Sequence, residues 1–350
     1  MNTIITKYHS SKITILNLVL IIMMLYRHAY YFEAENGNGI ALGVQRFIDY
    51  GLCNLTNSLF FVLSGFLFFK NISSPTQCLP KIKQCLPKIK KRIRSLLVPY
   101  VIWNCSFVVF YLMLSTLPGL GAYTSIDVLA KFTSLKDGLY YLFVTPASTP
   151  LWFLRDLMVY VAFSPLIYMC IEKLRWGFAL LLFLVSPLFP VSGILEFVLG
   201  GTIAICSNLE ILDKRLNNKI VATCIVIYLV NAVASIYYEY QRPIYIGNII
   251  TLTSIIAIWE GYNYIAKGRI LTESKFWKSI VGYSFFIYLS HTPALNIIKK
   301  IPIVIFGTSE INIIVWYLLS PLVFVAIAIP VAKSMQRFVP SLYSLLVGGR

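Results

Sequence analysis

The segment ITILNLVLIIMMLYRHAYY at residues 13–31 decides the class of fold, because it is long and apolar enough to cross a lipid bilayer as one helix. No small-residue cleavage site follows it, which indicates a retained helix rather than a signal peptide. Further apolar stretches lie near 52–69, 95–115, 151–171, 176–190, 191–207, 219–237, 244–262, 279–298 and 311–332. We therefore predict an all-α, polytopic transmembrane bundle of about ten helices.

The composition agrees with a single membrane-embedded domain over residues 1–350. The chain is 58% hydrophobic and 13% charged, whereas soluble domains are about 25% charged. Its net charge of +16 is typical of membrane proteins with basic cytoplasmic loops, so we expect the lipid bilayer and not nucleic acid as a partner. The seven cysteines form no CxxC motif, and we expect neither a disulfide nor a metal site.

The distribution of charge predicts the orientation. With both termini in the cytoplasm, the cytoplasmic segments hold 22 of the 30 Lys and Arg residues. A basic cytoplasmic loop at about 70–94 holds eight of them and contains the tandem repeat QCLPKIK at 77–83 and 84–90. We interpret the repeat as a local duplication without a catalytic role. The stretch 117–150 is predicted to form an interfacial segment on the outer face.

Ionisable residues inside spans are costly and are therefore candidates for function. They are Arg27, His28, Arg155, Asp156, Glu196, Glu260 and His291. The predicted topology places most of them toward the outer side, whereas His9 is expected to be incidental. A neutral imidazole is a natural general base for a hydroxyl, and Arg27 or Arg155 could hold a polar or anionic group nearby. The structural alternatives are an interfacial role for His28 and an ion pair for Arg155 with Asp156.

Four strings go beyond composition: NSLFFVLSGFLFF at 57–69, KKRIRSLLVPYVIWN at 90–104, LWFLRDLMVYVAFSPLIY at 151–168 and SFFIYLSHTPAL at 284–295. With a first helix that ends in His28, they resemble the acyltransferase-3 family of bacterial membrane O-acyltransferases. The resemblance implies transfer of an acyl group, usually acetyl, from cytoplasmic acyl-CoA to a hydroxyl of a glycan or lipid-linked glycan, without a tightly bound cofactor. It also implies the bacterial inner membrane as the location and His28 as the catalytic residue.

The sequence departs from the family pattern where the donor is expected to bind. Asn17 stands where members often carry an arginine, eleven residues before the histidine. Arg92 matches the first residue of an Arg-x-x-Arg pattern, but Ser95 occupies the second and Arg94 is adjacent. Our donor-binding candidates are Arg92, Arg94 and Asn17. The candidates for binding or supporting the substrate are Arg27, Trp152, Arg155, Asp156, Glu196, Tyr288 and His291.

Two other interpretations of the sequence are a secondary transporter or polysaccharide flippase, and a sensory membrane protein. Transporters favour inverted repeats with matching broken helices, and we find no such symmetry in the sequence. No feature favours a sensory protein. Within the acyltransferase interpretation, direct transfer with His28 as base and transfer through an acyl-enzyme both remain open. The Ser64–Gly65 pair is expected to let the second span approach a neighbour closely.

Overall fold

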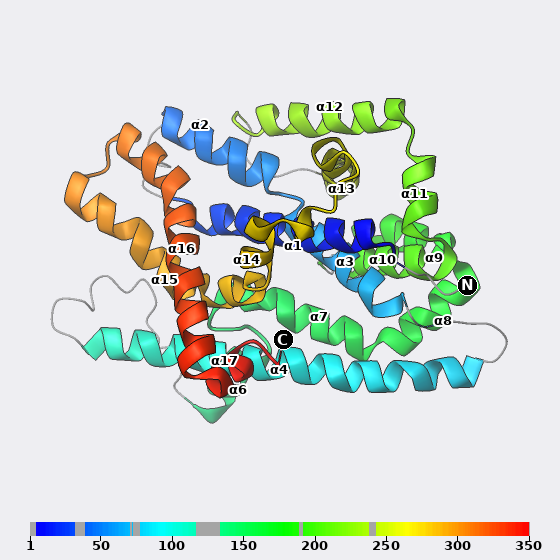
Figure 1. The fold of residues 1–350 in the computed structure, drawn as a ribbon, viewed down its shortest axis with the longest axis horizontal. Helices are drawn as coiled ribbons and strands as arrows, with labels where there is room; N and C mark the ends of the chain where they lie inside the picture. Colours follow the sequence, from blue (N-terminus) through cyan, green and yellow to red (C-terminus); the bar gives the residue numbers. More distant parts are fainter. Residues whose placement is uncertain are drawn as a thin grey trace.

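The computed structural model describes residues 5–31, 39–70, 72, 78–116, 134–188, 192–237 and 243–349, and all regular structure within them is helical (Figure 1). This confirms the predicted all-α class. The α-helices are α1 (Lys7–His28), α2 (Ile40–Arg46), α3 (Thr56–Phe69), α4 (Cys78–Thr116), α6 (Leu135–Phe143), α7 (Trp152–Ala162), α8 (Ser164–Leu174), α9 (Trp176–Val185), α10 (Ile194–Cys206), α11 (Leu209–Arg215), α12 (Asn218–Ala234), α13 (Ile244–Ala266), α14 (Lys275–Val281), α15 (Ser284–Phe306), α16 (Glu310–Phe338) and α17 (Pro340–Leu346).

Among the described residues, five helical segments are long and apolar enough to cross a membrane: Lys7–His28, Ile40–Phe69, Cys85–Thr116, Ile244–Ala266 and Glu310–Phe338. The pairs α7–α8 and α10–α11 are bent by 64° and 102°, and counting each pair as one span raises the number to seven. Helices α9 and α12 are apolar but shorter, with 10 and 17 residues. Several polar residues, including the charged Lys299 and Lys300, lower the hydropathy of α15. A multi-span protein is thus confirmed, and the count of ten stays a prediction.

Helices α3 and α10 pack closely because glycines meet at their crossing. A Cβ atom added to Gly65 would lie 2.0 Å from the carbonyl oxygen of Phe197, and one added to Gly200 would lie 1.9 Å from that of Val62. Only glycine leaves room for backbones at such a distance. The close approach predicted for Gly65 is therefore confirmed, and it places α3 between α1 and α10.

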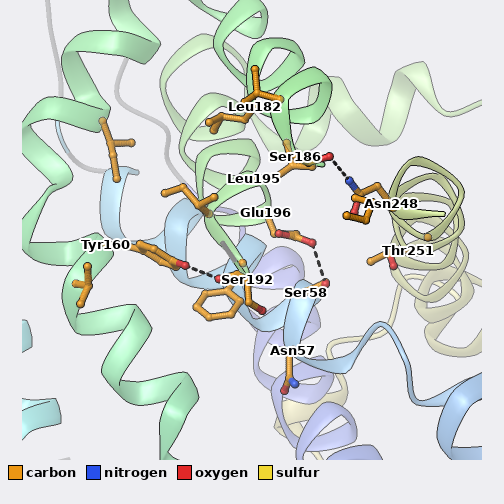
Figure 2. A pocket seen from close by; sticks show the side chains of 18 of the residues that line it. Asn57, Ser58, Tyr160, Leu182, Ser186, Ser192, Leu195, Glu196, Asn248 and Thr251 are labelled. Carbon is orange, nitrogen blue, oxygen red and sulfur yellow. Dashed lines mark hydrogen bonds between the residues drawn. The ribbon is translucent and has the colours of Figure 1, made fainter. Parts of the chain in front are cut away.

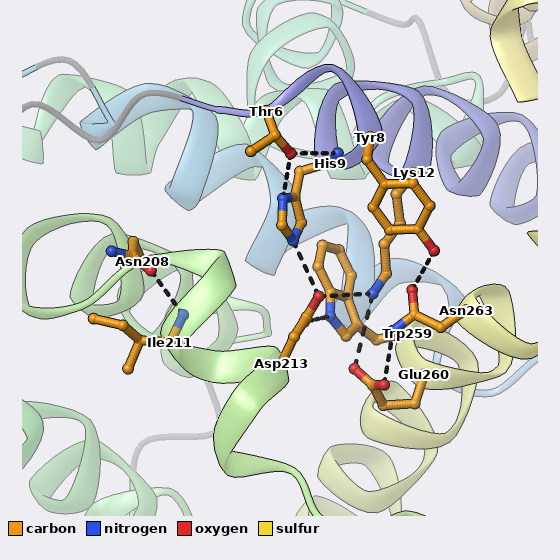
Figure 3. Close-up of polar contacts among 10 residues, drawn as sticks. All are labelled: Thr6, Tyr8, His9, Lys12, Asn208, Ile211, Asp213, Trp259, Glu260 and Asn263. Atoms are coloured by element: carbon orange, nitrogen blue, oxygen red, sulfur yellow. Dashed lines mark hydrogen bonds and ion pairs between the residues drawn. The ribbon is translucent and has the colours of Figure 1, made fainter. Parts of the chain in front are cut away.

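Helix α1 lies in the middle of the bundle, with α4 along one side and α12 along the other (Figure 1). Its first turns are held by a buried charged network (Figure 3). The fully buried Lys12 lies 3.6 Å from Asp213 and 3.8 Å from Glu260, and its Nζ is 3.8 Å from the centre of a Trp259 ring. His9 Nε2 lies 3.0 Å from the Asp213 carboxylate. His9, which the sequence did not link to any other residue, therefore belongs to this network, because α11 brings Asp213 within reach of it.

The other end of α1 is held by α15. Lys299 Nζ donates hydrogen bonds to the carbonyl oxygens of His28, at 3.1 Å, and Tyr30, at 2.7 Å. A cation at this position satisfies carbonyls that lack partners at a helix C-terminus and interacts favourably with the helix dipole. Both ends of α1 are therefore fixed, which fixes the position of His28 relative to α15.

Candidate functional site

His28 and His291 lie side by side where α1 ends. Their ring centroids are 4.9 Å apart, and His291 is 1% exposed. The two residues come from helices separated by more than half of the chain, and the anchoring of α1 by Lys299 on α15 explains their proximity. The structure thus brings together the two histidines that the sequence placed on one side of the membrane.

The hydrogen bond of His291 fixes the state of its ring. Its Nδ1 lies 2.5 Å from the carbonyl oxygen of Tyr288, and because a carbonyl only accepts, Nδ1 must carry the proton. In the neutral ring, Nε2 then bears the lone pair. This Nε2 is buried and has no hydrogen-bond partner among the described residues. A base is therefore present beside His28, with its orientation set by the backbone of α15.

A cavity of 340 Å³, here called the central cavity, follows α1 toward the histidines. Thr14, Asn17 and Ile21 line it and lie on one helix face, and His28 follows on the same face two turns beyond Ile21. Tyr288 also lines this cavity, and its ring centroid is 6.1 Å from that of His291. The central cavity therefore extends along α1 in the direction of the histidine pair and ends at Ile21 and Tyr288, and neither histidine lines it.

The far end of the central cavity meets a positively charged pocket of 590 Å³, here called the basic pocket. Arg92 lines both, and Lys88 and Lys91 line the basic pocket. Arg94 instead lines a neighbouring pocket of 700 Å³ that shares Lys91. Of the donor candidates, Asn17 and Arg92 thus share one cavity, and Arg94 faces a different one.

The other arginine candidates are engaged with carboxylates. Arg27 Nε lies 3.4 Å from Asp49 Oδ1, and its Nη1 donates to the carbonyl oxygen of Cys53 at 3.2 Å. Arg155 contacts Asp156 Oδ1 through Nε at 2.7 Å and Nη2 at 2.6 Å. Arg155 and Asp156 thus form the ion pair that the sequence offered as an alternative to a substrate-binding role. Neither of these two residues forms a hydrogen bond or ion pair with the described histidines.

The remaining candidates lie around an aromatic cluster. The Trp152 ring is 6.3 Å from that of Phe61 and 6.4 Å from that of Phe153. Tyr288 Oη donates to the carbonyl oxygen of Pro150 at 2.8 Å, which ties α15 to the turn before α7. Of these two residues, only Tyr288 lines the central cavity, and Trp152 packs behind it against Phe61 and Phe153.

Glu196 lies apart from the histidines, in a cavity of 740 Å³ between α3, α8, α9, α10 and α13, here called the Glu196 cavity (Figure 2). Ser58 Oγ donates to its Oε1 at 2.9 Å. Sequence reasoning missed the polar residues that surround it, such as Asn57 and Asn248. The sequence did contain a signal for these residues, because amide side chains are uncommon inside apolar spans and need a hydrogen-bond partner there.

Taken together, these features define a multi-pass membrane protein with a buried histidine pair and a basic pocket that adjoins a central cavity along α1. A family model described as an acyltransferase domain matches residues 12–335, so the chain belongs to the acyltransferase-3 family and is an O-acyltransferase. It is 25% identical to the succinoglycan biosynthesis protein ExoH of Rhizobium meliloti (strain 1021), over 97% of this chain and 92% of that protein. No solved structure matches the chain. Membership of this family favours an enzyme over the transporter or flippase considered above.

Among the described residues, no group of three His, Cys, Asp or Glu side chains is placed to hold a metal ion.

Proposed function

We propose that the protein transfers an acetyl group from cytoplasmic acetyl-CoA to a hydroxyl of a cell-surface polysaccharide or its lipid-linked precursor, in the inner membrane of a bacterium. The observation that carries the proposal is the connection of the basic pocket to the central cavity through Arg92. The printed name of the relative ExoH supports a polysaccharide as the acceptor.

The proposal includes ten spans with both termini in the cytoplasm. In this topology the basic loop at 70–94 faces the cytoplasm, where positive residues accumulate and where acyl-CoA is available. His28 then lies toward the outer side, which is the side of the glycan. The donor is held at one face of the membrane and its acyl group is used nearer the other.

The basic pocket suits the phosphates of coenzyme A. Lys88, Lys91 and Arg92 line it, and guanidinium or ammonium groups bind phosphate through charge-assisted hydrogen bonds. The uncharged arm of the donor would then follow the central cavity past Asn17. Eleven residues of α-helix separate Asn17 from His28, a rise of about 16 Å. A long and thin donor arm fits this distance better than a compact molecule does.

In the proposed reaction, His28 removes the proton from the acceptor hydroxyl while that oxygen attacks the thioester carbonyl carbon. The new C–O bond forms the ester, and the C–S bond breaks when the tetrahedral intermediate collapses. The imidazolium of His28 returns the proton to the coenzyme A sulfur. His291, whose ring lies 4.9 Å from that of His28, is a positioning residue that orients the His28 ring by packing against it.

Asn17 stands where the family pattern often has an arginine, so the contact with the donor at this position is uncharged. An amide donates and accepts hydrogen bonds but carries no charge. Arg92, which lines the same cavity, is then the charged group nearest to the arm of the donor. We expect the affinity for the donor to depend on Arg92 more than on Arg94.

The test compares Arg92→Ala with Arg94→Ala in purified enzyme. A hydrogen bond to a charged group contributes about 1.5–3 kcal/mol, so Arg92→Ala is expected to raise the KM for acetyl-CoA about 10- to 100-fold, with the acceptor KM unchanged. Arg94→Ala is the matched control and should have a smaller effect. Unchanged donor kinetics in the Arg92 variant would refute the donor route.

A further inference from the structure

The lining of the Glu196 cavity combines polar and apolar groups (Figure 2). Its polar groups are hydroxyls, amides and one carboxylate, from Asn54, Asn57, Ser58, Tyr160, Ser186, Ser192, Glu196, Asn248 and Thr251. No Lys, Arg or His occurs among the described residues that line it. Its volume of 740 Å³ lies within the range of small-molecule sites, which are mostly apolar with a few well-placed polar groups.

From this lining we infer that the Glu196 cavity binds an uncharged, hydroxyl-rich sugar unit of the acceptor. The inference rests on the proposed function, because it supplies the second substrate of the transfer. It assigns donor and acceptor to two separate cavities, the central cavity and the Glu196 cavity.

The charge of the cavity argues for a neutral ligand. A phosphate or uronate would lie near the Glu196 carboxylate without a described cation in the lining to offset the repulsion, whereas a hydroxyl donates to a carboxylate at no such cost. A carboxylate accepts about four hydrogen bonds, and Ser58 provides one of them. The remaining capacity suits the hydroxyl groups of a sugar.

Part of the lining is aromatic and aliphatic. Phe61, Tyr160 and Phe163 line the cavity, and the rings of Phe61 and Tyr160 lie 5.5 Å apart. Tyr160 Oη donates to the carbonyl oxygen of Ser192, which fixes the ring at the edge of the cavity. Such rings can cover the C–H face of a sugar while the polar groups bind its hydroxyls.

The position of the cavity also fits an acceptor. Asn54 lines it and directly follows Cys53, whose carbonyl oxygen accepts a hydrogen bond from Arg27, the neighbour of His28. Phe61 lines the Glu196 cavity and Phe153 lines the central cavity, and their ring centroids are 4.5 Å apart. The two cavities are thus separated by one pair of aromatic rings.

Neighbouring aromatic rings connect the pair Phe61 and Phe153 to the histidine pair. The Phe153 ring lies 6.3 Å from that of Tyr288, and Tyr288 lies 6.1 Å from His291. A sugar in the Glu196 cavity would therefore be at the same end of α1 as the histidines, with its attached chain free to extend toward them.

The experiment fills the cavity and leaves the donor route intact. Thr251 on α13 lines the Glu196 cavity, and Thr253 on the same helix does not. Thr251→Trp and the control Thr253→Trp are purified in lipid nanodiscs and checked for equal thermal stability. The acceptors are oligosaccharides cut from the polysaccharide of a deletion strain and separated by anion exchange into neutral and acidic fractions, with acetyl-CoA as the donor.

We expect the wild type to prefer the neutral fraction, and Thr251→Trp to raise the acceptor KM more than tenfold without changing the donor KM. Thr253→Trp should behave as the wild type, and Glu196→Gln should reduce the discrimination against the acidic fraction. An unchanged acceptor KM in Thr251→Trp, or a preference of the wild type for acidic oligosaccharides, overturns the inference.

A second readout separates this inference from the proposed function. If the wild type transfers no acetyl group, saturation-transfer NMR measures the binding of the neutral fraction directly. Binding that Thr251→Trp abolishes and Thr253→Trp retains supports the sugar site and refutes only the acetyl transfer. Absence of binding by the wild type overturns the site itself.

Discussion

Replacement of His28 by alanine is the most direct test of the catalytic site. A positioned general base contributes about 10²–10⁴-fold to a proton transfer, which corresponds to about 3–5.5 kcal/mol at 1.4 kcal/mol per factor of ten. In His28→Ala the nearest remaining base is Nε2 of His291, in a ring 4.9 Å from the original one. That ring is tied through Nδ1 to the Tyr288 carbonyl and cannot move into the vacated position without breaking this bond. We therefore expect His28→Ala to lower kcat by the whole contribution of the base, about 10²–10⁴-fold.

His291→Ala should cost less, because it removes the group that orients the base and not the base itself. Both variants are expressed at matched levels in a deletion strain, ester-linked acyl groups are counted on the isolated glycan, and kcat is measured on purified enzyme. Near-normal acylation by His28→Ala would refute the mechanism. An inactive His291→Ala beside an active His28→Ala would show that His291 is the base.

Three further predictions concern topology and stability. With native cysteines replaced by serine, an impermeant thiol reagent should label Lys136→Cys but not Lys219→Cys in intact spheroplasts, and the reverse pattern would refute the proposed orientation. Lys12→Ala removes the cation beside the buried carboxylate of Glu260 and should destabilise the fold by about 3–5 kcal/mol in reversible denaturation, whereas the exposed Lys7→Ala should change stability little. Gly65→Ala should lower the thermal midpoint because its methyl group meets backbone; an unchanged midpoint would contradict the close packing of α3 and α10.

The class of fold and the family could be predicted from the sequence because both depend on local features. Apolar runs of sufficient length define spans, and the four strings quoted above, together with the histidine that ends the first helix, carry the family resemblance. The bends between α7 and α8 and between α10 and α11 were not predictable in this way, because a hydropathy pattern fixes where a segment is apolar and not its direction. The short helices α9 and α12, the two bent pairs and the less apolar α15 therefore account for the difference between the ten predicted spans and the five to seven candidate spans of the structure.

For the candidate site, the sequence predicted only which residues lie on the same side of the membrane, because the topology determines this. The predicted topology placed His28 and His291 on one side of the membrane, together with Glu196. The structure places Glu196 in a separate cavity. The topology predicts how deep a residue lies in the membrane, but it does not predict which helices pack beside it. For the same reason His9 was not predicted to meet Asp213, since their contact depends on the turn between α10 and α11.

The aromatic pair between the two cavities has a consequence for the order of events in catalysis. Because the contacting rings of Phe61 and Phe153 belong to different cavities, a donor in the central cavity and an acceptor in the Glu196 cavity, as proposed above, would occupy the enzyme simultaneously. Neither substrate has to leave before the other binds. Initial rates measured at several fixed concentrations of acceptor should then give intersecting lines in a double-reciprocal plot, the pattern of a ternary complex. Parallel lines would indicate that the acyl group is first deposited on the protein.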